Sequence, residues 1–177
     1  MSCLVPTSTL RSLDNVIKHF TRLMISRMES PVMVEVVTAF LENDNRILIL
    51  RRSTKVRTMK GKWGAVSGYL ENNDPLRQAV VEIKEETGLN NSDIQFIRSG
   101  HIVEATDPED SNIIYIVHPY LFHSKGIEII LSSEHDQCKW IALNEMSKYD
   151  TVPKLKEACE SVIVAHNILN DEENFRP

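Results

Sequence analysis

The sequence predicts an α+β fold in which helices cover a mixed β-sheet, the arrangement of an α/β/α sandwich. Two observations lead to this class. Short runs rich in β-branched and aliphatic residues recur along the chain, and a segment with apolar residues at helical spacing lies among them. Strands and helices are therefore interspersed within one domain. The predicted strands are residues 32–41, 46–50, 94–103, 113–122 and 137–141.

Composition and charge are those of a folded globular protein. The 177 residues suit a single domain, and 42% hydrophobic with 25% charged residues is too apolar for a disordered chain. The formal net charge of -5 argues against a protein that coats nucleic acid, because that role needs a broad positive surface. Any anion-binding site must therefore be local.

The cysteines Cys3, Cys138 and Cys159 are widely spaced and include no Cys-x-x-Cys pair. Neither a disulfide framework nor a thiolate zinc site is expected, and a reducing compartment fits best. Residues 1–9 have no charged flank followed by an apolar run, and no segment reaches membrane-spanning length. These features predict a cytoplasmic protein that does not enter a membrane.

Residues 10–28 predict an amphipathic helix that ends before Ser30-Pro31. We therefore expect an N-terminal helical extension (1–30), a main domain (31–170) and a C-terminal tail (171–177). The helix either packs on the core of the domain or forms a homodimer, and the sequence leaves both open. Its apolar stripe consists of Leu13, Val16, Ile17, Phe20, Leu23, Met24 and Met28.

The first two predicted strands are separated by the turn-forming residues Glu42-Asn43-Asp44-Asn45, which predicts a hairpin. Two further helices are expected late in the chain, one after Ala142 and one after Val152.

The most clearly marked helix runs from Asp74 to Thr87. The Asp74 side chain can accept hydrogen bonds from free amides at the helix start, Pro75 suits the first helical position, and Gly88 supplies a stop. One stripe of this helix is apolar and should be buried, with Glu82, Glu85 and Glu86 on the opposite side. The apolar stripe consists of Leu76, Ala79, Val80, Ile83 and Thr87.

Glu82, Glu85 and Glu86 lie at positions i, i+3 and i+4, so their carboxylates share one region of space and repel each other. A divalent cation would reverse that repulsion, and magnesium prefers oxygen ligands of this kind. Clustered glutamates on a solvated helix face are common, so the spacing alone also fits a surface without function.

The surrounding residues 68–89 favour a functional site. They resemble the Nudix box, Gly-x5-Glu-x7-Arg-Glu-U-x-Glu-Glu-x-Gly-U with U aliphatic, which is a long and specific motif. The match is degenerate, because Asp74 replaces the first glutamate, the following spacer is one residue short, and Val81 stands where the family has arginine. Arg77, one turn earlier, is a candidate substitute for that arginine.

The resemblance to the Nudix hydrolase family extends beyond the box. Residues 63–68 are similar to the strand and turn that precede the motif, and Glu134, Trp140-Ile141 and Glu145 are similar to the family's closing segment. The resemblance therefore implies a Nudix-type α/β/α sandwich with a mixed sheet, in addition to the N-terminal helix.

The resemblance also implies a magnesium-dependent hydrolase, with manganese as a possible substitute, that cleaves the phosphoanhydride bond of a nucleoside diphosphate linked to another moiety. By analogy Glu85 and Glu86 bind magnesium, and Glu82 binds metal or acts as general base. The backbone carbonyl of Ser67 is a further candidate ligand. For a catalytic carboxylate from a distant loop, Glu134 is the first choice and Glu104 the second. The catalytic candidates are thus Glu82, Glu85 and Glu134.

The segment 51–62 is basic and contains no acidic residue. Guanidinium groups make paired hydrogen bonds to phosphate, so Arg51 and Arg52 are candidate contacts for a small-molecule nucleotide or pyrophosphate substrate. Adjacent residues of a strand point to opposite faces, and at most one of them can face the site.

The replacement at Val81 leaves a second function open, a catalytically weak Nudix domain that binds a nucleotide or a partner protein.

Overall fold

The computed structural model describes residues 30–126 and 128–163. The expected N-terminal helix and C-terminal tail lie outside these residues, so the proposed extension, its role in a dimer and the tail stay predictions. The described elements are β1 (Val32–Asn43), β2 (Arg46–Arg52), β3 (Trp63–Gly64), β4 (Val66–Tyr69), α2 (Pro75–Thr87), β5 (Ile94–Ser99), β6 (Val103–Thr106), β7 (Ile113–Ser124), β8 (His135–Ile141), the 3-10 helix η1 (Leu143–Lys148) and a helix over residues 155–163.

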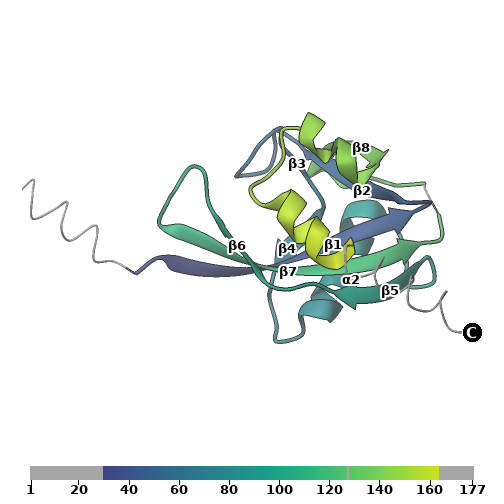
Figure 1. Cartoon of the computed structure of the whole chain (residues 1–177), viewed down its shortest axis with the longest axis horizontal. Helices are drawn as coiled ribbons and strands as arrows, with labels where there is room; N and C mark the ends of the chain where they lie inside the picture. Colours follow the sequence, from purple (N-terminus) through teal and green to yellow (C-terminus); the bar gives the residue numbers. More distant parts are fainter. Residues whose placement is uncertain (1–29, 127, 164–177) are drawn as a thin grey trace, which may run out of the picture. The chain divides into compact units, whose positions relative to one another are not determined.

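The strands form one sheet, in which β3, β2, β1, β7 and β5 are neighbours in that order (Figure 1). β4 pairs with β1, β6 with β7 and β8 with β2, each in antiparallel fashion. β1 and β7 run in the same direction, because contacts between them advance together along both strands. Glu35 meets His118 near their starts, and Glu42 meets His123 near their ends. The sheet is therefore mixed, as predicted.

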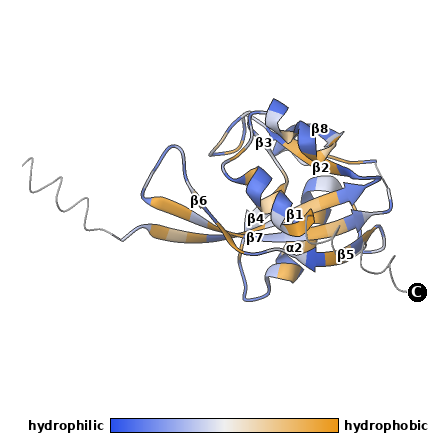
Figure 2. Ribbon diagram, in the orientation of Figure 1, coloured by the Kyte–Doolittle hydropathy of each residue, from blue (hydrophilic) through white to orange (hydrophobic). Residues whose placement is uncertain are grey.

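An apolar core lies on each face of the sheet. On one face Ala79 and Ile83 of α2 pack with Leu41 of β1, and on the other face Val162 of the helix 155–163 packs with Phe40. Side chains alternate along a strand, so β1 contributes to both cores. Figure 1 shows the two helices on opposite sides of the sheet, and Figure 2 shows polar residues gathered in the loops. The predicted α/β/α sandwich is confirmed.

The predicted hairpin forms between β1 and β2. Asp44 and Asn45 occupy the turn with φ values of 49° and 60°, a left-handed geometry that Asp and Asn tolerate better than most residues. The amide of Asn45 donates to the carboxylate of Glu42 at 2.9 Å. Turn chemistry visible in the sequence therefore fixes the register of the first two strands.

The predicted motif helix also forms with its expected ends. The Asp74 carboxylate accepts a hydrogen bond from the amide of Arg77 at 3.1 Å, and Pro75 is the first helical residue. At the other end Gly88 adopts a φ of 73°, and its amide donates to the carbonyl of Lys84 at 3.0 Å. These caps set the first and last residues of α2, which packs against β4.

The predicted strand over residues 94–103 is wrong as a single element, because β5 ends at Ser99 and β6 starts at Val103. The break falls at Gly100, whose amide donates a hydrogen bond to the carbonyl of Pro119. The pairing register of β5 with β7 already shifts between Phe96 and Arg98. The helix expected after Ala142 is the 3-10 helix η1. Among the described residues, no helix is long and apolar enough to span a membrane.

Candidate active site

A cavity of about 360 Å³ lies where β4, α2 and the start of the helix 155–163 come together. Its lining combines acidic residues of α2 with cationic and hydroxyl side chains from distant parts of the chain. Its polar and glycine lining residues include Thr38, Arg52, Thr58, Ser67, Gly68, Glu82, Glu85, Glu134 and Lys154. The fold thus brings most of the sequence-predicted residues to one place.

The three glutamates of α2 occupy different environments. Glu82 and Glu85 line the cavity, whereas Glu86 is 5% exposed and belongs to the buried face of the helix together with Ala79 and Ile83. The expectation that all three acids lie opposite the buried stripe is therefore wrong for Glu86. Glu82 and Glu86 face β4, because Glu82 lies against Gly68 and Glu86 accepts a backbone hydrogen bond from Ser67. The segment 132–135 covers Glu86.

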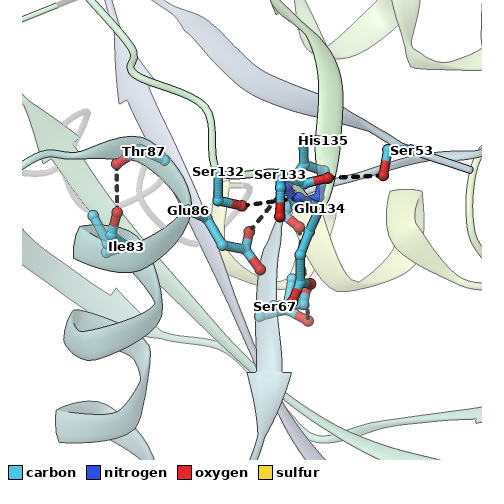
Figure 3. A network of polar contacts seen from close by, with 11 residues as sticks. Ser53, Ser67, Ile83, Glu86, Thr87, Ser132, Ser133, Glu134 and His135 are labelled. Atoms are coloured by element: carbon cyan, nitrogen blue, oxygen red, sulfur yellow. Dashed lines mark hydrogen bonds and ion pairs between the residues drawn. The ribbon is translucent and has the colours of Figure 1, made fainter. Parts of the chain in front are cut away.

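Burial gives Glu86 unusual electrostatics. It raises the pKa of the Glu86 carboxyl to about 9, with the nearby Glu82 and Glu134 carboxylates adding to the rise, while a backbone hydrogen bond from Ser67 and the charge of Arg52 oppose it. Within the described chain, Glu86 Oε2 has no hydrogen-bond partner. Figure 3 shows Glu86 of α2 facing Ser67 of β4 and the segment 132–135. A buried acceptor without a partner is costly unless something else satisfies it.

His135 is the residue that sequence reasoning missed. Its side chain is 2% exposed, and Nδ1 lies 3.9 Å from Glu86 Oε2, with no hydrogen-bond partner in the described chain (Figure 3). Burial lowers the pKa of His135 to about 4, and the charge of Arg52 adds to that effect. Its position next to Glu134 is the only sequence signal that pointed to it.

Glu82 is held from two sides. Its Oε1 accepts a hydrogen bond from the Gln78 amide nitrogen at 2.9 Å. A Cβ atom on Gly68 would lie 1.9 Å from the same oxygen, so the carboxylate needs a glycine at this position of β4. Desolvation raises the pKa of Glu82, the hydrogen bond from Gln78 lowers it, and the Glu85 and Glu134 charges raise it further.

Ser67 lies opposite Thr38 in the pairing of β4 with β1. Its hydroxyl is 3.1 Å from that of Thr38, and it donates to the carbonyl of Ala65 at 3.2 Å. These contacts fix the backbone of β4 where it forms part of the cavity wall, next to Glu86. The backbone of Ser67 also donates a hydrogen bond to the buried carboxylate of Glu86, and the metal-ligand role of the Ser67 carbonyl stays a prediction.

Glu134 reaches the cavity from the loop before β8. The loop is tied to the end of β2, because the Ser53 amide donates to the carbonyl of Glu134 at 2.7 Å and the Ser53 hydroxyl donates to that of Ser133 at 2.9 Å. Glu104 is exposed on β6 and does not line the cavity, whereas its neighbour Ala105 does. Of the two candidates for a distant carboxylate, the fold brings Glu134 to the site.

Arg51 and Arg52 point to different surroundings, as alternation along β2 requires. Arg51 makes a paired salt bridge with Asp136, at 2.6 and 3.0 Å, away from the cavity. Arg52 lines the cavity, and its Nε donates to the carbonyl of Thr58 at 3.1 Å, so the basic loop holds the guanidinium in place. Lys154 also lines the cavity, and its ammonium group pairs with Glu157 at 2.5 Å.

The donor set fits a hard divalent cation, because it consists of carboxylate oxygens and includes the unpartnered Oε2 of Glu86. Across residues 30–126 and 128–163, no three acidic, histidine or cysteine side chains converge on one point in the present rotamers. Glu85 and Glu134 are exposed at the cavity, so both can rotate toward an ion at little cost.

Comparisons with known proteins agree with this architecture. The NUDIX domain family matches residues 33–161. A CTP pyrophosphohydrolase of Escherichia coli (strain K12) is 28% identical over 123 residues, which cover 68% of this chain and 84% of that protein. The crystal structure of a MutT protein from Methanosarcina mazei Go1 is 25% identical with a TM-score of 0.59, covering 84% of this chain and 99% of the other.

A more distant structure shares the fold alone. An Ap4A hydrolase from C. elegans, solved as a binary complex, has a TM-score of 0.60 at 15% identity and covers 77% of this chain and 98% of its own. The domain match spans most of the chain, including the acidic helix and the cavity. The chain therefore belongs to the Nudix family.

Proposed function

We propose that this protein is a magnesium-dependent hydrolase that cleaves the phosphoanhydride bond of a nucleoside diphosphate linked to another moiety, with manganese able to replace magnesium. The observation that carries the proposal is the composition of the cavity, in which the acids Glu82, Glu85 and Glu134 stand with the cations Arg52 and Lys154. Carboxylates coordinate metal ions, and cationic side chains pair with the phosphate oxygens that no metal ion coordinates. A cytoplasmic location, expected from the cysteines, is part of the same proposal.

In this proposal Glu82, Glu85, Glu86 and the carbonyl of Ser67 hold the ion. When bound, magnesium supplies positive charge against the phosphate oxygens and makes a water molecule more acidic. Glu82 uses Oε1 for the hydrogen bond from Gln78, which leaves Oε2 to serve as a ligand. The name of the E. coli relative, a CTP pyrophosphohydrolase, supports a nucleotide substrate.

Separate side chains of the cavity bind the phosphate and accept the proton during hydrolysis. Arg52 holds a phosphate oxygen through its free guanidinium nitrogens, while Nε stays on Thr58. Glu134, exposed at the cavity, accepts the proton of the attacking water on a carboxylate oxygen, with Glu82 as the alternative base. The water oxygen bonds to phosphorus, the phosphoanhydride bond breaks, and a phosphate-containing group leaves.

The test is a panel of nucleoside triphosphates, nucleoside diphosphate conjugates and dinucleoside polyphosphates, incubated with magnesium and analysed for both products. We expect metal-dependent cleavage of a nucleoside diphosphate conjugate. Glu85→Gln should cut turnover by about two orders of magnitude or more, because the ion supplies several kcal/mol of transition-state stabilisation. Glu104→Gln is the matched control, since Glu104 is exposed and outside the cavity, and it should retain wild-type turnover.

The alternative function is a catalytically weak Nudix domain that binds a nucleotide or a partner protein. The features favouring it are Val81 in place of arginine and the shortened spacer of the box. Saturable binding of a nucleotide by the wild-type protein, with no cleavage of any panel member in magnesium or manganese, would favour this alternative and contradict the proposed hydrolase.

A further inference from the structure

A chain of side-chain amides, which the resemblance to the Nudix box does not predict, leads from outside the cavity to the Glu82 carboxylate in its lining. The Asn72 side-chain nitrogen donates to Gln78 Oε1 at 3.2 Å, and the Gln78 side-chain nitrogen donates to Glu82 Oε1 at 2.9 Å. We propose that Gln78, oriented by Asn72, is a positioning residue that fixes the carboxylate of Glu82 for catalysis. This inference rests on the proposed hydrolase function and names a further residue that serves it.

The hydrogen-bond directions follow from the chemistry of the groups. An ionised carboxylate only accepts, so Gln78 must turn its NH2 group toward Glu82. Its carbonyl oxygen then points the other way, where it meets the NH2 group of Asn72. Each amide in the chain thus has one orientation that satisfies both neighbours, and the orientation of Asn72 sets that of Gln78.

Burial and packing make this arrangement rigid. Gln78 is 5% exposed and lies four residues before Glu82, so the two side chains are neighbours on one helix stripe. The backbone of Gly68 confines the Glu82 carboxylate from the opposite side. A hydrogen bond to a charged group in a partly buried site contributes more than a neutral one on the surface. The rotamer of Glu82 is therefore set before any ligand enters.

The same contacts orient Glu82 without the arginine that the Nudix box has at position 81. Asn72 lies two residues before Asp74, and its Oδ1 also accepts a hydrogen bond from the amide of Asp74 at 2.9 Å. That turn joins Asn72 to the cap of α2 and brings its NH2 group to Gln78 in the first turns of the helix. Val81 is 39% exposed and has no polar group to offer, and Arg77 is exposed. The contact that reaches Glu82 comes from Gln78 instead.

The hydrogen bonds from Asn72 to Gln78 and from Gln78 to Glu82 form a relay, and two variants break it with little change in side-chain shape. Gln78→Met keeps the length and helix preference of the side chain but removes both its hydrogen bonds. Asn72→Asp keeps the oxygen that accepts from Asp74 but removes the donor to Gln78. Its matched control is Asn73→Asp, which adds the same charge at the next exposed position. Asn72 is itself exposed, so its variant tests the relay without opening the core.

Two readouts are measured on the full-length protein, manganese affinity without substrate and the kinetic constants in magnesium. Gln78→Met and Asn72→Asp should each lower kcat about tenfold with KM changed less than about twofold, and should weaken manganese binding, whereas Asn73→Asp should do neither. In a Glu82→Gln background, Gln78→Met should cause no further loss of manganese affinity, because Gln78 acts through Glu82.

The results separate this inference from the proposed function. A wild-type protein that neither cleaves the panel nor binds manganese would refute the hydrolase itself. An active wild type combined with unchanged kcat and manganese affinity in Gln78→Met would overturn the relay alone. Losses of manganese affinity that add fully in the double variant would also overturn it, because they would show that Gln78 acts independently of Glu82.

Discussion

The buried carboxyl of Glu86 leads to a quantitative prediction about stability in the absence of metal. Its pKa is raised from 4.5 to about 9 in the folded protein. Between those values the folded state holds a proton that the unfolded state has lost, so stability falls as pH rises through this window. At pH 7 the cost is about 3 kcal/mol at 1.36 kcal/mol per pH unit above 4.5. Glu86→Gln cannot ionise and should remove this cost.

The assay is urea unfolding in the presence of a chelator at pH 5 and pH 7.5, for wild type, Glu86→Gln and Glu85→Gln. Glu86→Gln should exceed the stability of the wild type by about 4 kcal/mol at pH 7.5 and by less than about 1 kcal/mol at pH 5. Glu85→Gln is the control, because this exposed residue lies in the same helix and its substitution should change stability by less than about 0.5 kcal/mol.

Magnesium should narrow this difference, because an ion at concentration c that binds only the folded protein stabilises it by RT ln(1 + c/Kd), and Glu86→Gln should bind the ion more weakly. Added magnesium should raise the melting temperature of the wild type more than that of Glu86→Gln. The reasoning would be refuted if wild type and Glu86→Gln had the same pH dependence without metal. Equal stabilisation of both proteins by magnesium would show that Glu86 is not a ligand.

Two other substitutions test the lining of the cavity. In steady-state assays Arg52→Ala should raise KM more than it lowers kcat, because a substrate contact of this kind is made equally in the ground and transition states. Arg51→Ala is the control: it breaks only an exposed ion pair and should keep the wild-type KM. Gly68→Ala should displace the Glu82 carboxylate and cut kcat by about tenfold or more. Gly126→Ala, which has open space around its Cβ position, is the control and should leave kcat unchanged. Equal kcat values for the two alanine variants would contradict the close packing of Gly68 against Glu82.

Local chemistry explains what could be predicted from the sequence. The turn at Asp44-Asn45 and the caps of α2 at Asp74 and Gly88 depend on residues a few positions apart, so their signals survive in the linear sequence. The spacing of the glutamates on α2 follows from helix geometry alone. The fold class and the family were accessible for the same reason, because both depend on patterns within short segments.

The split of the predicted strand 94–103 shows where local patterns fail. Residues on both sides of the break have strand character, and the chain turns at Gly100 because its amide bonds to Pro119 on β7. That partner is distant in sequence and becomes a neighbour only when the sheet assembles. Strand ends set by pairing cannot be recognised from propensity within the strand.

At the site, the sequence by itself determined the acidic helix, the candidate Glu134 and the rule that only one of Arg51 and Arg52 can face the cavity. Only the tertiary structure decided that this residue is Arg52, since Asp136 takes the other guanidinium. It likewise decided that His135 faces a buried Glu86. Burial and desolvation depend on which distant segments cover a side chain, and helical spacing carries no information about that cover.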